Sequence, residues 1–428
     1  MSKKFLIVII ITIILAIVIG VLRFKNIDFS NPMEFLTSLV DDTQPIPQEF
    51  DTVAGANNQF AFDLYSEYKS EKGNIFFSPY SISTALTMTY EGAKGKTAEE
   101  MQVVLRIPKD DEKRRLESEK IYKQINKSSE DYKLSTANAL WAQKDYQFLE
   151  EYINNVEKYY GGKTTNLNFI KETEKSRLTI NNWIENQTNN KIKNLIPRGA
   201  VNPLTRLVLT NAIYFKGTWV LQFDKKDTRD ENFKTDSGQT IKVPTMKLTG
   251  DDAEFNYAKT DKVQILELPY DGGNLSMLLI LPEEDNFKKL EKSINTKKLS
   301  EWKNALEKQR VDIYIPKFKF ETKYFMADIL KEMGMSDAFV FGVADFSGMD
   351  GTRDLYITDV IHQAFVEVNE EGTEAAAATA VVVGWGSAGD IEKPAIPIFR
   401  ADHPFIFIIQ QKETGNILFM GRVNNPSE

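Results

Sequence analysis

The chain contains no cysteine and only two histidines, His362 and His403. Without thiols, disulfide bonds and thiolate metal sites are excluded, and the redox compartment stays undetermined. A metal site would have to depend on carboxylates, and the sequence contains no Asp/Asn-rich calcium loop. We therefore expect neither a bound metal nor a cofactor.

The sequence also lacks an excess of positive charge. Its formal net charge is −8, which argues against nucleic acid as a partner. The one basic cluster, 113–115, is flanked by acidic residues at 110–112 and at Glu117. Such alternation is typical of a solvated helix face, so we expect no nucleic-acid site.

Two enzyme motifs are matched only in part. Residues 384–389 satisfy G-x-G-x-x-G, but Pro394 and Pro397 follow and prevent the helix whose N-terminus would hold a pyrophosphate. The sequence around Ser387 lacks the first glycine of the motif G-x-S-x-G. His362 lies in phase with apolar residues of a predicted strand, where a histidine is usually a hydrogen-bonded core residue. We therefore expect that the protein is not an enzyme. A membrane-tethered enzyme remains an alternative hypothesis.

Near the N-terminus, residues 5–22 form a run of 18 residues without a charge. Such a run is just long enough to cross a bilayer. No Ala-x-Ala-type cleavage site follows, which favours a signal anchor over residues 1–23, with a cleaved signal peptide as the alternative. Residues 24–50 contain three prolines and no sustained period, so we expect a tether before one large domain at 51–428.

Apolar periodicity divides the large domain into a helix-rich first part and a strand-rich second part. Apolar side chains share one helix face at 60–68 and again at 180–184. This order favours an α+β fold over a βαβ repeat. Apolar runs predict strands at 207–215, 263–268, 275–281, 311–320, 364–368 and 405–409.

Two local features refine this expectation. The apolar alternation of 311–320 changes phase at Pro316-Lys317, which predicts a bulge or kink there. Residues 413–416, Glu-Thr-Gly-Asn, lie between two apolar runs and are the predicted turn of a final hairpin.

The segment from Val368 to Gly389 has conflicting local preferences. Its alanine run favours a helix, whereas 380–383, Ala-Val-Val-Val, favours extended backbone. Composition alone favours a helix that runs into a strand. The small side chains would also let the segment lie in a loop and fit between two strands.

Residues 370–379 resemble the reactive-loop hinge of inhibitory serpins. Further stretches are similar to motifs of that family and follow in the family's order. Together they cover about 51–426, nearly everything beyond the N-terminal segment. The matching stretches are 74–82, 209–219, 315–318, 344–349, 402–407 and 417–423.

The resemblance implies a serpin fold: α+β, three β-sheets, about eight to nine helices and an exposed reactive loop. It also implies a suicide-substrate inhibitor of serine proteases, or of cysteine proteases. The protease forms an acyl-enzyme, and the cut loop then enters the central sheet as a new strand, a step for which serpins are the known example. The alternative is a non-inhibitory serpin-fold binding or scaffold protein.

The resemblance also implies where the protein works and in what state. We expect a monomer outside the cytoplasm, because an inhibitor of this kind usually meets its targets there. It would be held at a membrane through residues 5–22, or secreted if the signal is cleaved.

Three groups of site residues follow from the resemblance. The shutter, beneath the central sheet, comprises Ser78, Ser81, Asn211 and His362. The breach, where the loop enters the sheet, comprises Trp219 and Lys317, with Lys317 paired to Glu370. The hinge comprises Glu370, Gly372, Thr373, Glu374, Ala375, Ala376, Ala377, Ala378 and Thr379.

The hinge has the side-chain pattern of a strand that could be inserted. Alternate residues of a strand face the same side, and on one side this segment carries only small or β-branched, uncharged side chains. Glu374 falls on the opposite side. The side that would be buried comprises Thr373, Ala375, Ala377, Thr379, Val381 and Val383.

The position of the scissile bond stays open. Counting from the start of the hinge places it at Gly386-Ser387, but the segment up to Pro404 is longer than the family usually shows. Counting back from 402–404 gives a bond around 391–393. Glycine offers nothing to a specificity pocket; Trp385 would suit a chymotrypsin-like or subtilisin-like protease, and Val383 an elastase-like one.

Overall fold

The structure, a computed structural model, describes residues 50–126, 132–250, 252–260, 262–284, 286–373 and 395–428. These residues belong to one compact unit, Glu49–Glu428. The predicted anchor lies outside the described residues, as do the hinge from Glu374 to Thr379 and every candidate scissile bond. In the part that is described, no helix is both long enough and apolar enough to span a membrane.

The central sheet has six strands in the order β12-β13-β14-β4-β2-β3. β4 pairs in parallel with β13 over most of its length, and the short β14 lies between their ends. The strands are β2 (Tyr132–Gln143), β3 (Lys163–Leu167), β4 (Leu207–Thr218), β12 (Phe318–Phe325), β13 (Ile357–Asn369) and β14 (Gly372–Thr373).

Two further sheets accompany the central one. A seven-stranded sheet has the order β1-β17-β16-β9-β8-β7-β10, and a four-stranded sheet has the order β15-β11-β6-β5. Their strands are β1 (Ile75–Phe77), β5 (Arg229–Lys234), β6 (Thr240–Leu248), β7 (Glu254–Lys259), β8 (Val263–Pro269), β9 (Leu275–Pro282), β10 (Glu307–Arg310), β11 (Asp312–Pro316), β15 (Ile398–Arg400), β16 (Phe405–Gln411) and β17 (Ile417–Val423).

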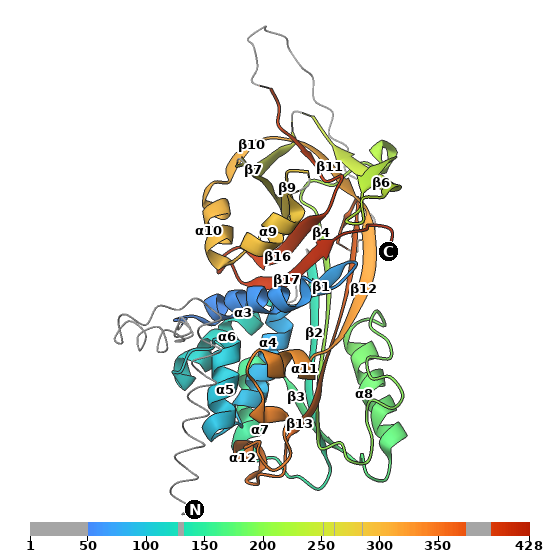
Figure 1. The fold of residues 1–428 in the computed structure, drawn as a ribbon. Coiled ribbons are helices and arrows are strands. Elements are labelled where there is room, and N and C mark those ends of the chain that lie inside the picture. The colour runs from blue at the N-terminus through green and yellow to red at the C-terminus, as the bar shows by residue number, and fades with distance from the viewer. Residues whose placement is uncertain (1–49, 127–131, 251, 261, 285, 374–394) are drawn as a thin grey trace, which may run out of the picture. The chain divides into compact units, whose positions relative to one another are not determined.

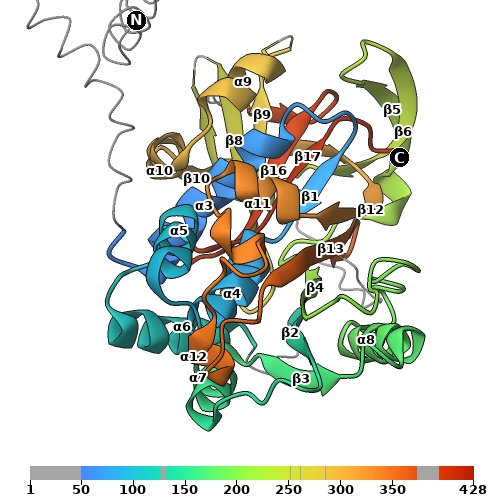
Figure 2. The same cartoon turned by 60° about the horizontal axis from the view of Figure 1, so that its bottom comes forward.

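Helices cover both faces of the central sheet. Figure 1 shows α4 and α7 on one side of β2 and β13 and α8 on the other, and Figure 2 shows the same layers from below. The helices are α3 (Val53–Tyr68), α4 (Pro79–Tyr90), α5 (Gly95–Leu105), α6 (Asp111–Ile125), α7 (Glu150–Tyr160), α8 (Thr173–Gln187), α9 (Phe287–Ser293), α10 (Thr296–Asn304), α11 (Ala327–Glu332) and α12 (Ser347–Asp350).

Among the described residues there are therefore ten α-helices and three sheets. This confirms the predicted α+β class with three sheets. The helices exceed the expected eight or nine, and two of them, α11 and α12, have only six and four residues.

A large apolar core lies between the central and the seven-stranded sheet. Phe76 of β1 stacks on Phe407 and Phe419 of the neighbouring strands, with ring centroids 5.6 and 5.3 Å apart. These rings and the inward side chains of β4 and β13 belong to one buried cluster. The inner face of the central sheet is thus set against a dry, close-packed layer.

The predicted kink at Pro316-Lys317 marks a change of sheet. β11 ends at Pro316 in the four-stranded sheet, and β12 begins at Phe318 in the central sheet. The phase of apolar alternation changes there because the two strands face different layers. The predicted final hairpin is also present, as β16 and β17 pair antiparallel on either side of 413–416.

The prediction of a mostly helical first half was incomplete. β2 and β3 lie in that half, and β2 is the direct neighbour of β4. The segment 135–139, Ser-Thr-Ala-Asn-Ala, gives no alternation of large apolar and polar residues. The pairing with β4, rather than a local pattern, accounts for this strand.

Candidate functional site

The hinge begins as a strand within the central sheet. Gly372 and Thr373 form β14, which pairs antiparallel with both β13 and β4. Beyond β14 the two strands pair directly and in parallel, from Ala364–Ile213 down to Ile357–Leu207. β14 therefore occupies the open end of a gap that the direct pairing closes.

Thr373 is buried in the intact chain. Its side chain faces the core, and its hydroxyl lies 2.6 Å from the hydroxyl of Tyr270. This agrees with the predicted inward face at this one position. Because Thr373 is buried before cleavage, a large or charged side chain at 373 would disturb the intact protein as well as an inserted form.

A close backbone approach requires glycine next to Thr373. A Cβ atom on Gly372 would lie 2.0 Å from the carbonyl oxygen of Gly217 in β4. Real Cβ atoms do not approach backbone this closely, so β14 fits between its neighbours only with glycine at 372. Gly217 is constrained too, since its own Cβ would lie 2.8 Å from the ring of Tyr270.

Trp219 stabilises the chain segment that leads into β14. Its indole stacks on the ring of Tyr270 with centroids 4.5 Å apart, and its Nε1–H donates to the carbonyl oxygen of Asn369 over 3.1 Å. Its backbone N–H donates to the carbonyl of Glu371 over 2.9 Å. Trp219 thus contacts the backbone at Asn369 and Glu371, immediately before β14, and its breach role stays a prediction.

Lys317 and Glu370 form the expected pair beside β14. The Lys317 Nζ lies 2.8 and 3.1 Å from the two carboxylate oxygens, and Thr228 donates its hydroxyl to the same carboxylate over 2.8 Å. Burial raises the pKa of Glu370, but the hydrogen bonds from Lys317 and Thr228 outweigh burial and leave that pKa lowered. Because the Glu370 side chain is only 3% exposed, this is more than a surface ion pair.

The shutter residues meet where β13 and β4 pair directly. His362 and Asn211 are register partners, and the His362 Nδ1 contacts the Asn211 Oδ1. The backbone N–H of Ser78 donates to His362 Nε2 over 3.1 Å. These two contacts fit a neutral imidazole with its proton on Nδ1. Burial agrees, because it lowers the pKa of His362 to about 3.

The network continues through a residue that the sequence did not single out, Asn138 of β2. The Asn211 amide donates to Ser81 Oγ over 2.5 Å and to Asn138 Oδ1 over 2.6 Å. Ser81 Oγ also lies 3.1 Å from that Asn138 oxygen. An asparagine inside the small and apolar run 137–142 resembles Asn211 in its strand, and this was the available signal.

Ser78 connects this network to a helix and to the second sheet. As the N-cap of α4, its hydroxyl accepts from the backbone N–H of Ser81 over 3.1 Å. The same hydroxyl donates to the carbonyl of Leu418 in β17 over 2.6 Å. The shutter therefore joins both strands of the closed gap to the layer beneath them.

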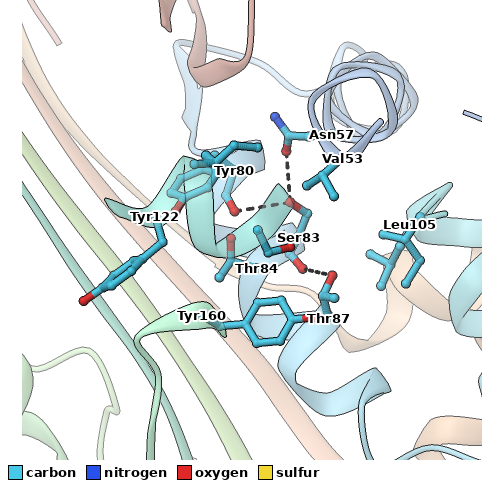
Figure 3. A pocket seen from close by; sticks show the side chains of 12 residues that line it. Val53, Asn57, Tyr80, Ser83, Thr84, Thr87, Leu105, Tyr122 and Tyr160 are labelled. Atoms are coloured by element: carbon cyan, nitrogen blue, oxygen red, sulfur yellow. Dashed lines mark hydrogen bonds between the residues drawn. The ribbon is translucent and has the colours of Figure 1, made fainter. Parts of the chain in front are cut away.

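The enclosed cavity among the helices offers little room. The cavity among α3, α4, α6 and α7 in Figure 3 is lined by Tyr80, Ser83 and Thr87 among others, and has about 20 Å³ of free space. That is room for a single water molecule. A more open groove of about 470 Å³ runs along the breach past Lys317 and Glu370. Within the described residues, no cluster of His, Asp or Glu could hold a metal ion.

Both histidines have their two ring nitrogens engaged by other groups of the protein. His362 is enclosed by Asn211 and Ser78, and His403 contacts Asp402 and the carbonyl of Pro282. Ser387 and the G-x-G-x-x-G stretch lie outside the described residues.

These features define a mixed α+β protein in which the short strand β14 lies between the ends of β13 and β4 in the central sheet. The family model described as "Serpin (serine protease inhibitor)" matches residues 55–426. The chain therefore belongs to the serpin family, and the predicted serpin fold is confirmed.

Individual relatives agree with this assignment. A serpin-like protein of Thermococcus kodakarensis is 45% identical over 378 residues, which is 88% of this chain and 86% of the relative. Human serpin B3 is 41% identical over 396 residues, covering 88% of this chain and 100% of the relative. The structure of human thyroxine-binding globulin in complex with thyroxine superimposes with a TM-score of 0.79 at 30% identity, covering 88% and 99% of the two chains.

Proposed function

We propose that this serpin is a suicide-substrate inhibitor that traps serine proteases, or cysteine proteases, by loop insertion, and not an enzyme. The observation that carries the proposal is β14. Two residues of the hinge are already paired with β13 and β4, so the strand that insertion would extend has begun in the intact protein. A protease that cuts the loop would free its far end to continue along this path.

Continuing the register predicts where each hinge residue would arrive. Thr373 pairs with Val368 and Gly217, so each later residue would move one step down both ladders. Thr379 would then stand opposite His362 and Asn211, which are partners of one another in the intact protein. The hinge threonine would meet the shutter pair at the same level of the sheet.

Insertion as far as Thr379 would give the shutter residues a second set of hydrogen bonds. Insertion at that level separates His362 from Asn211 and breaks their side-chain contact. A threonine hydroxyl both donates and accepts, so Thr379 could serve either freed partner. Because His362 is neutral, no charge would be left unpaired by the separation.

We infer the target class from the candidate scissile bonds. Cleavage after Trp385 would fit a chymotrypsin-like or subtilisin-like protease, and cleavage after Val383 an elastase-like one. Cleavage at Gly386-Ser387 fits the count from the hinge. The same proposal places the protein outside the cytoplasm, anchored through residues 5–22 or secreted after signal cleavage.

The function is tested by incubating the protein with chymotrypsin-, subtilisin- and elastase-like proteases. We expect a complex that survives denaturing electrophoresis, and mass spectrometry of the released C-terminal peptide would give the scissile bond. A non-inhibitory serpin would be cleaved without forming a complex. That second function is favoured by one observation, the similarity to a globulin solved with a bound small molecule.

A matched pair of variants tests the register. Ala377→Glu would place a carboxylate inward between Ala364 and Ile213, which are both fully buried. Ala376→Glu would place the same carboxylate outward, beside the partly exposed Phe365 and near Lys319. We expect Ala377→Glu to be cleaved as a substrate, whereas Ala376→Glu should still trap the protease. Equal trapping by both variants would show that the register is wrong.

A further inference from the structure

The corner 401–404 carries the chain from β15 in the four-stranded sheet to β16 in the seven-stranded sheet. β15 has three residues, and among the described strands it lies at the edge of its sheet and pairs only with β11. It is the first described strand after the reactive loop. Contacts at this corner therefore help to determine how firmly the C-terminal end of the loop is held.

His403 occupies the corner with both ring nitrogens engaged. Its Nδ1 lies 2.7 Å from the carboxylate Oδ1 of Asp402, and its Nε2 lies 2.8 Å from the carbonyl oxygen of Pro282 at the end of β9. Both partners are acceptors. A neutral imidazole carries one N–H, so it can satisfy only one of them, whereas an imidazolium satisfies both.

Other charged groups also face this ring. Lys234, Asp236, Glu284 and Lys288 line a cavity of about 210 Å³ beside it, and Lys234 is paired with Glu284. Burial lowers the pKa of His403, but the contacts with Asp402 and the Pro282 carbonyl and the charge of Glu284 outweigh burial and raise it above 6.5. Cysteine is absent, so histidine is the only side-chain type here whose ordinary pKa lies near neutrality.

We propose that protonated His403 links the β15–β16 corner to the end of β9 through two hydrogen bonds, and that this link depends on pH. Both hydrogen bonds of this link form while both ring nitrogens carry protons. One of the two is lost when the ring becomes neutral. Because the pKa is raised, its stabilising effect is fully present below pH 6.5 and is lost as the pH rises through the pKa of the folded state. The edge strand β15 is then held less firmly.

The composition of the chain allows a direct test by histidine NMR on the full-length protein. The ring of His362, with a pKa of about 3, stays neutral between pH 5 and 9, so a ring signal that titrates there comes from His403. We expect one titrating histidine with a midpoint above 6.5, and we expect Asp402→Asn to lower that midpoint by about one unit. The surface variant Asp328→Asn, on α11, should leave it unchanged. A wild-type midpoint at or below 6.5, or no response to Asp402→Asn, would overturn the proposal.

Hydrogen exchange tests the mechanical role separately from the titration. We compare wild type with His403→Gln, whose neutral side-chain amide cannot be protonated in this pH range. At pH 5.5 the variant should exchange faster than wild type across 398–405, and at pH 8.5 the two should converge. A difference of equal size at both pH values, or no difference at either, would show that protonation of His403 does not hold the corner.

Discussion

The space between β13 and β4 is closed in different ways at the breach and at the shutter. At the breach, a piece of the hinge itself fills the gap, held by Tyr270, Trp219 and an ion pair at Glu370. At the shutter, the two strands contact each other directly, and neutral side chains bind across the junction. At the breach a strand can be extended without opening the pair, whereas the shutter must exchange its hydrogen bonds to admit a strand.

This difference indicates where the barrier and the driving force for insertion lie. Below β14 one parallel ladder would be replaced by two antiparallel ladders, which are slightly more stable for each residue. The cost is concentrated at the shutter, where buried polar groups lose their partners while the strands part. We therefore expect the breach to determine the register of an inserted strand and the shutter to resist premature opening.

The largest effect that would sharpen this comparison is a gain in stability after cleavage. Cutting the loop between 383 and 393 should let the hinge fill the gap and bury Val381 and Val383, worth about 1.5–3 kcal/mol each. From these two side chains alone we expect Tm to rise by about 4–8 °C. Calorimetry of intact and cut protein measures this directly.

The control for that experiment is a cut in the tether, residues 24–48, which should leave Tm unchanged. An ordinary exposed loop gains nothing from being nicked. A loop-cut protein that melts at or below the intact form would exclude insertion and favour the non-inhibitory alternative.

A second, smaller effect tests the shutter. His362→Ala removes the partner of the Ser78 backbone N–H and of the Asn211 side chain, at about 1–3 kcal/mol for each group left unpaired. We expect a lower Tm and polymers or inserted forms on mild heating, detected by native electrophoresis. The double variant with Asn211→Ala should cost less than the sum of the two single changes, because the residues share one network. Unchanged melting and no polymer would contradict the shutter role.

The sequence by itself predicted features of the fold, but it did not by itself predict the breach and the shutter. Composition and periodicity alone indicated an α+β chain, a phase change at Lys317 and a final hairpin, because those features are local. The shutter and breach positions came from the family resemblance, and their roles remain predictions. Asn138 was missed and the burial of Thr373 was not foreseen, because both depend on pairing between strands that are distant in sequence.

A third effect, at the breach, depends on pH. The pKa of Glu370 is lowered, so its contribution is present above the ordinary carboxyl pKa and is lost as the pH falls through the pKa of the folded state. Glu370→Gln should cost about 1–2 kcal/mol at pH 7, an estimate reduced because Lys317 is partly exposed. The difference in Tm from wild type should begin to shrink as the pH falls below the ordinary carboxyl pKa, and it should vanish only below the lowered pKa of Glu370 in the folded state. Glu367→Gln, which breaks the more exposed pair with Lys319, is the control and should cost less.

The smallest effect decides whether the hinge has entered the sheet before cleavage. Thr373→Val and Tyr270→Phe each remove one hydroxyl of a buried pair 2.6 Å apart, and the double variant removes both. A cycle of the three variants in urea should give a coupling of about 0.5–1.5 kcal/mol, because a hydroxyl left alone costs more than two that are absent.

The same cycle on loop-cut protein provides the control. Since Thr373 already pairs in β14, its contact with Tyr270 should be the same before and after cleavage, and so should the coupling. A coupling that appears only in the cut protein would show that Thr373 enters the sheet after cleavage. In that case the breach of the intact protein is held by Trp219 and Glu370 alone. The breach and the shutter would then resemble one another more than the structure indicates.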